Sequence, residues 1–341
     1  MIAVDQSQVE YETTQLINYI SPIIRANDTR HAIVAFIRDI LHKSALLDGF
    51  VIECGSSALK SYLPESDLDL VLLAPTSRNN REEIQCLTAI FNSWCDEIAD
   101  KDEGKSSHSE MTIRNVEFVN ARTKLAHCLV NNISVDITVN QIGAILTLTF
   151  LEEADRLIGG DHLFKKSLLL IKSWCLHESS RYCGSAITGA KAGMLSSYAV
   201  GVLVLHIFNK YCNLTHPFSV LRSFLYTYMS FPWDTHVLTV DGAVPLSSFS
   251  TSSSVAPPPG SPSDASNRFQ NLLDRLAQHP ALYLYQLGGS AVHHGRFTAK
   301  CCNIQDPIDA YNNLGISVPR SSLQLITQAC RSGFHHLEAV L

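Results

Sequence analysis

The chain lacks several features that would assign it at once to a common class. No apolar run reaches the ~18–20 residues of a membrane-spanning helix, so no membrane span is predicted. The first residues, Met1 to Asp5, contain no basic segment, and we expect no secretory signal. The 10 cysteines include no C-x-x-C pair, which favours reduced thiols over a disulfide framework. These absences predict an intracellular protein, in either the nucleus or the cytoplasm.

Charge and repetition are also limited. The net charge of −6 argues against a broad surface that coats nucleic acid. No internal repeat is visible, which excludes a solenoid or an array. With 341 residues and a hydrophobic content of 46%, the chain is long and apolar enough for one large or two ordinary domains, each with a buried core.

Two aspartates in an apolar run are the most informative feature. Asp67 and Asp69 are one residue apart, so on a strand they share one face while Leu68 and Leu70 share the other. Neighbouring carboxylates repel each other, and a divalent cation such as Mg²⁺, which prefers oxygen ligands, would offset this repulsion. Acids that face water on a strand edge are the alternative interpretation.

A Gly-Ser turn shortly before these acids favours the metal-site interpretation. Gly55 allows the backbone to approach a ligand closely, and a short helix beginning near Ser56 would direct N–H groups at a phosphate. An ordinary turn after a strand would explain the two residues alone. The turn and the paired carboxylates together predict a phosphoryl-transfer site.

A third acid stands in a second strand-like segment. Residues 133–139 are β-branched with period-two polarity, and Asp136 lies on the opposite face from Val135 and Ile137. On a strand beside residues 68–73, Asp136 would complete a three-carboxylate cluster for two metal ions, Mg²⁺ or Mn²⁺. Without the upstream pair, a hydrogen-bonded strand acid would be the favoured interpretation.

These segments resemble a known family. Residues 55–70 are similar to the G-S … D-x-D signature of the DNA-polymerase-β-like nucleotidyltransferases, and residues 134–137 resemble the strand of its third aspartate. Residues 303–315 resemble the nucleotide-recognition motif of the poly(A)-polymerase-like terminal RNA nucleotidyltransferases. The three motifs follow one another in the family order, and the matching segments span roughly residues 48–335.

The resemblance implies an α+β fold with two lobes. The first is a mixed β-sheet lobe of the nucleotidyltransferase fold, expected at residues 47–140. The second is a larger, all-helical substrate-binding lobe of the poly(A)-polymerase type, built from residues 1–46 and 141–341. Its Ser- and Pro-rich residues 247–266 predict a flexible insertion. The donor nucleotide is expected in the cleft between the lobes.

The resemblance also assigns roles to single residues. Asp67 and Asp69 would coordinate both metal ions, and Asp136 would hold the ion at the attacking hydroxyl and accept its proton. The implied nucleotide-binding residues are Gly55, Ser56, Lys172, Ser197, Tyr198, Asp306 and Asn312.

Three of these nucleotide-binding residues have specified contacts in the resemblance. Lys172 would contact the triphosphate, Ser197 would reach a phosphate, and Tyr198 would stack on the base. A solvent-exposed helix lysine and a buried helix aromatic are the alternative readings of Lys172 and Tyr198.

The implied activity is template-independent transfer of a nucleoside monophosphate to an RNA 3′-hydroxyl, with release of pyrophosphate. Asn312 stands where uridylyl-preferring relatives carry histidine, which favours ATP over UTP as donor. Leu176 replaces a second lysine that some relatives have. Uridylyl transfer, another acceptor, and a catalytically inactive RNA-binding or scaffold protein remain alternatives. Because no RNA-binding module or basic tail is visible, strong RNA affinity would need a partner protein.

Hydrophobic periodicity predicts the secondary structure. The expected strands are at residues 49–54, 68–73, 111–120, 122–129 and 133–139, with a turn at Asn131-Asn132. The expected helices are at residues 9–25, 28–46 with Asp28 as N-cap, 80–99, from 142 onward through 161–177, 194–211, 217–230 and 319–337.

Overall fold

The structure of the protein, a computed structural model, describes residues 6–44, 49–75, 80–101, 111–120, 123–251, 269–277 and 297–341. These residues divide into two compact units. The sheet unit contains the described residues between 22 and 149, and the helical unit contains residues 6–21 and the described residues from 150 to the C-terminus.

The sheet unit is built on a five-stranded mixed sheet. Its strands are β1 (Phe50–Cys54), β2 (Leu68–Leu73), β3 (Ile113–Asn120), β4 (Lys124–Val130) and β5 (Ile133–Val139), in the order β1-β2-β5-β4-β3. β2 and β5 pair in parallel, and all other neighbours in this sheet are antiparallel. Asn131 and Asn132, with φ of 46° and 67°, form the two-residue turn between β4 and β5, because asparagine tolerates positive φ. The predicted mixed sheet is confirmed.

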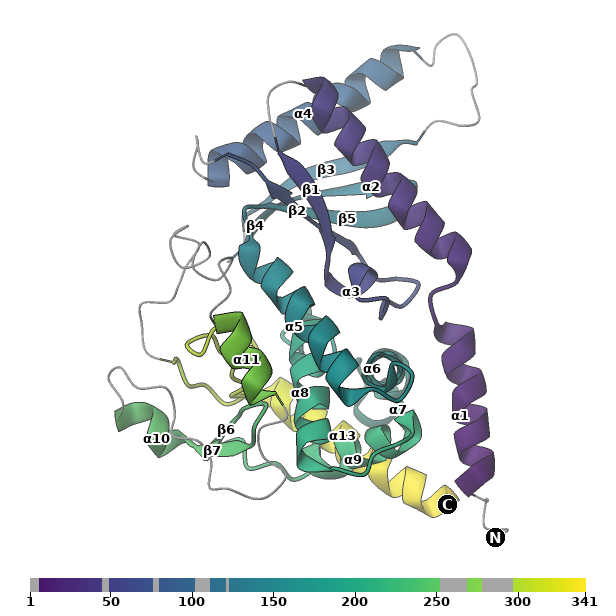
Figure 1. The fold of residues 1–341 in the computed structure, drawn as a ribbon, viewed down its shortest axis with the longest axis vertical. Coiled ribbons are helices and arrows are strands. Elements are labelled where there is room, and N and C mark those ends of the chain that lie inside the picture. Colours follow the sequence, from purple (N-terminus) through teal and green to yellow (C-terminus); the bar gives the residue numbers. More distant parts are fainter. Residues whose placement is uncertain are drawn as a thin grey trace. The chain divides into compact units, whose positions relative to one another are not determined.

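One face of this sheet is covered by two helices, α2 (Ile24–Ser44) and α4 (Asn80–Lys101), as Figure 1 shows. Ile33, Ile37 and Ile40 of α2 recur at helical spacing and are all buried in the same core as alternate residues of the strands. Burying one such side chain contributes about 1.5–3 kcal/mol. Because strand side chains alternate, the same packing turns the intervening residues of β2 and β5 to the other face.

The N-terminal helices differ from the prediction. α1 (Gln6–Ile20) ends before Pro22, and α2 begins at Ile24, so Asp28 lies inside α2 and not at its N-cap. Proline has no backbone N–H to donate, and it disfavours helical geometry in the residue before it. The predicted continuation of the first helix to residue 25 and the N-cap at Asp28 were therefore wrong.

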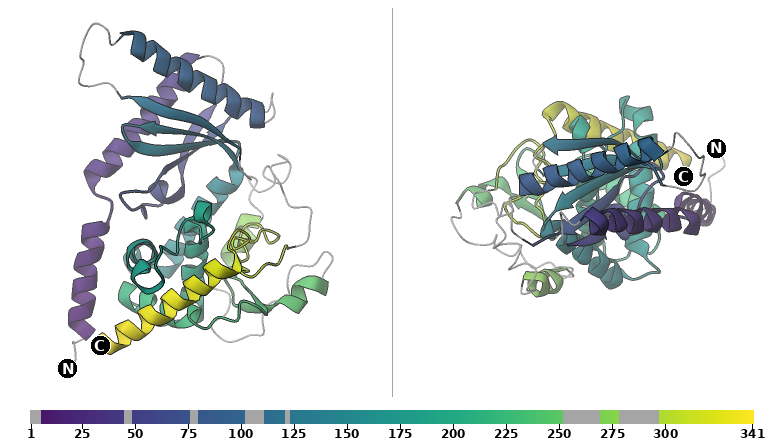
Figure 2. Two further views of the ribbon diagram at one scale, coloured as in Figure 1. Left: turned by 180° about the vertical axis from the view of Figure 1, so that it is seen from behind. Right: turned by 90° about the horizontal axis from the view of Figure 1, so that it is seen from above.

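The helical unit is arranged around α8 (Ser197–Lys210), which is buried over most of its length. α6 (Leu163–Ser173) and α9 (Pro217–Tyr228) pack against α8, and the long C-terminal helix α13 (Arg320–Val340, yellow in Figure 2) packs against α9. The other helices are α1, α5 (Ile142–Ile158) from Phe150 on, the π-helix at Trp174–Glu178, α7 (Ser180–Cys183), the 3-10 helix at Ala190–Ala192, α10 (Leu246–Thr251) and α11 (Gln270–Ala277).

Several elements of this unit were not predicted, among them the short helices α7 and α11. A two-stranded sheet of β6 (His236–Leu238) and β7 (Ala243–Pro245) interrupts the helices, and its three-residue strands are too short to show period-two polarity. α10 occupies Leu246–Thr251, where the flexible insertion was predicted to begin. The rest of that predicted insertion, residues 252–266, lies outside the described residues.

The units group α2 with the sheet, whereas the sequence-based boundaries place it in the helical lobe. The functional domain boundaries at 47–140 therefore stay a prediction. None of the helices in the described part of the chain is long and apolar enough to cross a bilayer. The 10 cysteines all lie within the described ranges, and none forms a disulfide.

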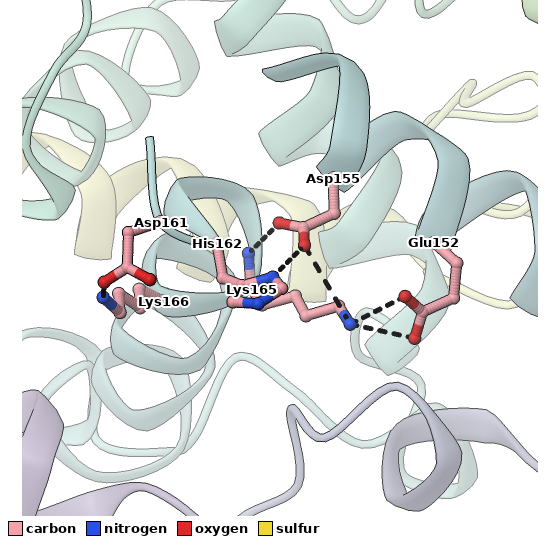
Figure 3. Close-up of polar contacts among 6 residues, drawn as sticks. All are labelled: Glu152, Asp155, Asp161, His162, Lys165 and Lys166. Atoms are coloured by element: carbon pink, nitrogen blue, oxygen red, sulfur yellow. Dashed lines mark hydrogen bonds and ion pairs between the residues drawn. The ribbon is translucent and has the colours of Figure 1, made fainter. Parts of the chain in front are cut away.

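A buried aspartate caps the start of α6 (Figure 3). Residues 159–162 all have positive φ, between 52° and 72°, and they form the tight turn between α5 and α6. The carboxylate of Asp155, only 2% exposed, accepts a hydrogen bond from His162 Nδ1 at 2.6 Å and from the Lys165 backbone N–H at 3.3 Å. The Lys165 ammonium bonds Glu152 at 2.7 Å and lies 3.9 Å from Asp155. Asp155 therefore links the end of α5 to the first turn of α6.

We expect Asp155→Ala to lower the free energy of unfolding by about 0.5–2 kcal/mol, because the partly buried Lys165 N–H in the first turn of α6 loses its capping acceptor. Thermal or urea unfolding of the purified protein measures the change. The control is Asp161→Asn, which removes a carboxylate that is 85% exposed and pairs with Lys166 in the same turn, and which keeps a side chain that tolerates the positive φ of residue 161. An equal loss in both variants would contradict the capping role of Asp155.

Candidate functional site

Two of the predicted acids lie side by side in the sheet. Asp69 of β2 and Asp136 of β5 are partners in the parallel register, so their side chains leave the same face of strands about 4.8 Å apart. Leu68 and Leu70, which flank Asp69, are buried in the core on the other face. The backbone thus brings together two carboxylates that are 67 residues apart in sequence (136 − 69).

Asp67 immediately precedes β2 and is half-buried. It follows a turn in which Ser66 N–H donates to the carbonyl of Leu63 at 2.9 Å. The backbone carbonyl of Asp67 accepts a hydrogen bond from Arg30 Nη1 at 3.3 Å, and that of Ser66 accepts one from Arg30 Nη2 at 2.6 Å. The position of Asp67 is therefore tied to helix α2.

Gly55 begins the short helix α3 (Gly55–Ala58) directly after β1, as the Gly-Ser turn predicted. Its φ is +64°, and a Cβ at this position would lie 2.1 Å from Asp69 Oδ2. Only glycine therefore lets the Asp69 carboxylate pack against the turn. Ser56, the next residue, is half-buried. Burial and the nearby Asp69 raise the pKa of the Cys54 thiol to about 12, so this thiol stays neutral at pH 7.

The sequence analysis missed His127, which contacts the third acid. His127 Nδ1 lies 2.7 Å from Asp136 Oδ1, and the side chain of Asp136 is 13% exposed. The two residues are partners across the antiparallel pair of β4 and β5. The signal was present in the sequence, because each residue is four positions from the two-residue turn at Asn131-Asn132. Counting outward from that turn would have placed them opposite each other.

The acids fit a hard divalent cation by donor type and by backbone placement, since Mg²⁺ prefers carboxylate oxygens. Within the described ranges, no group of three or more His, Cys, Asp or Glu side chains is arranged to hold a metal. Asp136 directs one of its oxygens at His127. The structure therefore places Asp67 and Asp69 at the start of β2 and Asp136 beside Asp69 in the middle of β5, without closing the three carboxylates into a cage.

The helical unit contains the other predicted residues, and three of them meet. The Tyr198 hydroxyl donates to Asp306 Oδ1 at 2.8 Å, and Asn312 Nδ2 donates to Asp306 Oδ2 at 2.9 Å. The Ile308 N–H also donates to Asp306 Oδ1 at 2.9 Å. Asp306 is thus the centre that orients both a phenol and an amide.

Burial raises the pKa of the Asp306 carboxyl, while the hydrogen bonds from Ile308, Asn312 and Tyr198 act in the opposite direction. The side chain is 8% exposed, so replacing it leaves those three donors without their acceptor. Asp306 therefore orients the side chains of its neighbours and offers little exposed surface to a ligand.

A second residue missed by the sequence analysis, Asn313, shapes this turn. Its Oδ1 accepts from the N–H groups of Ile304 at 3.1 Å and Gly315 at 2.9 Å, and its Nδ2 donates to the carbonyl of Cys302 at 3.2 Å. Asn313 is 2% exposed. Asn313 therefore holds the backbone of the turn, while Asn312, the residue before it, directs its side chain at Asp306.

The remaining two predicted residues lie on neighbouring helices of the same unit. Lys172 is in the last turn of α6 and is buried, at 6% exposure, which excludes the alternative of a solvated helix lysine. Ser197 is the first residue of α8, directly after Ser196, whose Oγ caps the helix by accepting from the Ala199 N–H at 3.1 Å.

We expect Gly55→Ala to abolish divalent-cation binding that depends on Asp69. The added methyl group collides with the carboxylate, and the positive φ costs about 1–2 kcal/mol. The control is Gly184→Ala, at φ +80° with no atom within 4 Å, which carries the backbone strain alone. Divalent-cation binding and unfolding temperature measure the two effects. Normal cation binding by Gly55→Ala would contradict the close packing of Asp69.

The fold is shared with solved structures. A structure of a cytoplasmic RNA terminal U-transferase has a TM-score of 0.65 and 17% identity, covering 97% of this chain and 93% of that chain. The Cid1 poly(U) polymerase with Mg and 3′-dATP bound has a TM-score of 0.66 and 16% identity, covering 98% and 95%. Cid1 in complex with its short product ApU has a TM-score of 0.63 and 16% identity, covering 98% and 95%. At such identities the likeness establishes the fold alone.

Sequence comparison is more specific for the helical unit. No curated protein sequence matches the chain significantly. Residues 158–341, more than half of the chain, match the PAP/OAS1 substrate-binding domain. These residues contain α6, α8 and the turn around Asp306. The chain therefore belongs to the PAP/OAS1 substrate-binding domain family, and its sheet unit has a mixed-sheet nucleotidyltransferase fold.

Proposed function

We propose that the protein is a template-independent terminal RNA nucleotidyltransferase that transfers AMP from ATP to an RNA 3′-hydroxyl. The observation that carries the proposal is the parallel register of Asp69 and Asp136, with Gly55 against the Asp69 carboxylate. This arrangement stands in a chain of the PAP/OAS1 substrate-binding domain family. The likeness to RNA terminal U-transferase structures supports the same class of reaction.

The proposal assigns Asp67, Asp69 and Asp136 as ligands of two divalent cations, Mg²⁺ or Mn²⁺. Such ions would lower the pKa of a hydroxyl and offset the charge of a triphosphate and of the leaving pyrophosphate. Two carboxylates on adjacent strands are costly to hold together without a cation. Cid1 is described with Mg and nucleotide bound, which supports the cofactor assignment.

The reaction would be a single displacement at the α-phosphorus. The 3′-oxygen of the RNA forms a new bond to this phosphorus while the bond to the bridging oxygen of the β-phosphate breaks, and pyrophosphate leaves. Asp136 accepts the proton of the hydroxyl. The hydrogen bond from His127 occupies one oxygen of Asp136, so the other oxygen is the one assigned to this task.

In the helical unit, Lys172 and Ser197 are assigned to the phosphates and Tyr198 to the face of the base. The orientation of Asn312 supports adenine as that base. Since its nitrogen donates to Asp306, its oxygen points away from Asp306 and can only accept. Adenine presents an amino donor at the position where uracil presents a carbonyl acceptor, so this orientation favours ATP.

Uridylyl transfer is the second candidate, because several of the similar structures are described as a poly(U) polymerase or a U-transferase. Within that group, a histidine-to-asparagine variant of Cid1 is described bound to MgATP. That description agrees with asparagine being compatible with ATP. A different acceptor and a catalytically inactive scaffold are the remaining alternatives.

The first test is primer extension on a short unstructured RNA with each of the four nucleoside triphosphates and Mg²⁺ or Mn²⁺. We expect ATP to be incorporated, and Asp69→Asn to lower kcat by about 10³-fold, since a lost metal ligand removes several kcal/mol of transition-state stabilisation. Asp39→Asn removes an exposed carboxylate of α2 and serves as the control. Extension that survives Asp69→Asn would eliminate the proposed chemistry.

The second test concerns the base. We expect Asn312→His to raise the ratio of UTP to ATP incorporation by about tenfold or more, because the imidazole N–H replaces an oxygen acceptor with a donor. Competition between the two labelled triphosphates measures the ratio directly. The control is Asp309→Asn, in the same turn. Wild-type preference for UTP would replace adenylyl by uridylyl transfer in the proposal.

A further inference from the structure

The segment before β2 is held to helix α2 by one buried arginine. Arg30 is 3% exposed, and its guanidinium donates to two successive backbone carbonyls, those of Ser66 at 2.6 Å and Asp67 at 3.3 Å. None of the ion pairs in the described ranges involves Arg30. Its hydrogen bonds therefore go to the two peptide groups on either side of the Asp67 Cα.

The guanidinium is itself held in place. Its Cζ lies 4.2 Å from the centre of the Tyr62 ring, and the Tyr62 hydroxyl donates to Asn27 Oδ1 at 2.9 Å. Tyr62 is 3% exposed, and Asn27 lies one turn before Arg30 on α2. Stacking on an aromatic face fixes the plane of the guanidinium, which in turn fixes the direction of its donors.

Hydrogen bonds from a charged donor to carbonyl oxygens are about twice as strong as neutral ones. The two carbonyls bonded by Arg30 belong to the Ser66–Asp67 and Asp67–Leu68 peptide groups, which flank the Cα of Asp67. A rotation of either group would move the Asp67 side chain relative to Asp69, which is fixed by the β2 ladder and by Gly55. The separation of the two carboxylates thus depends on Arg30.

We propose that Arg30 is a positioning residue that sets the placement of Asp67 for divalent-cation binding and nucleotidyl transfer. This inference rests on the proposed function, which makes Asp67 a metal ligand. Groups that orient metal ligands typically change metal affinity or activity about 10–100-fold when they are removed. The competing view is that Arg30 only attaches α2 to the rest of the sheet unit.

The same helix offers a control for the competing view. Arg38 lies two turns after Arg30 and donates from Nε at 3.2 Å and from Nη2 at 2.8 Å to the carbonyl of Val51 in β1. It also links α2 to the backbone of the sheet unit, but at Val51 and not beside an aspartate. Arg38 is more exposed than Arg30, so the unfolding temperature of each variant is measured alongside.

The experiment compares Arg30→Met, Arg30→Lys and Arg38→Met in the full chain. Mn²⁺ binding is measured by calorimetry without nucleotide, and kcat and KM are measured by primer extension with ATP. We expect Arg30→Met to weaken Mn²⁺ binding and lower kcat, each about 10–100-fold, with KM for ATP changed less than about threefold. Arg30→Lys should recover part of both, and Arg38→Met should match the wild type in both.

Equal Mn²⁺ binding and kcat in Arg30→Met and Arg38→Met would overturn the inference, whatever their unfolding temperatures. If Arg30→Met does not fold, Tyr62→Phe decides. It keeps the ring under the guanidinium and removes the bond to Asn27, and we expect a smaller loss of Mn²⁺ affinity and kcat in the same direction. A Tyr62→Phe protein with wild-type values would then overturn the inference.

The outcomes separate this inference from the proposed function. Mn²⁺ binding that depends on Asp69 and is weakened by Arg30→Met, without any RNA extension, would support the positioning role and reject the proposed reaction. Normal extension in all Arg30 variants would reject the positioning role alone. A wild-type protein that neither binds Mn²⁺ nor extends RNA would reject both.

Discussion

The parallel pairing of β2 with β5 is the constraint on which the rest of the candidate site depends. In this register Leu68 and Leu70 face the core with Val135 and Ile137, and the alternation of the pleat sends Asp69 and Asp136 to the opposite face together. A slip of one residue in either strand would bury a carboxylate and expose a leucine or valine. The hydrophobic free energy of the core therefore also fixes the spacing of the acids.

Each acid is then adjusted by a different neighbour. The Asp69 carboxylate packs against Gly55, where a Cβ would collide with it. Asp136 is hydrogen-bonded to His127, and Arg30 holds the backbone at Asp67. The three supports come from β1–α3, β4 and α2, which are separate elements of the sheet unit. The sheet therefore determines where the three acids lie, and these neighbours determine how the acids are oriented.

In the helical unit too, one residue orients functional side chains and another holds the backbone. Asp306 is buried and accepts hydrogen bonds from a tyrosine, an amide and a backbone N–H, while Asn313 pins the backbone of the same turn. Buried polar groups of this kind specify one arrangement, because every alternative leaves a donor or acceptor unsatisfied. The direction of the Asn312 amide follows from this network and not from its own local preference.

Much of the sheet unit was predictable from sequence. Alternating apolar residues gave β2 and β5 with their bounds, the Asn131-Asn132 pair gave the hairpin turn, and Asp67, Asp69 and Gly55 stood out by spacing alone. These features are local, since they depend on residues a few positions apart. The start of α2 was misplaced because apolar spacing continues across Pro22, and β6 and β7 were too short to leave a pattern.

Contacts between distant segments could be decided only by the tertiary structure. Nothing in the local sequence shows that Arg30 would reach the carbonyls of Ser66 and Asp67, or that Tyr198 would donate to Asp306 across 108 residues. Side-chain direction depends on which element packs alongside, and that choice is made by the whole core at once. The sequence therefore determined which residues carry the chemistry, and the fold decided which neighbours hold them in position.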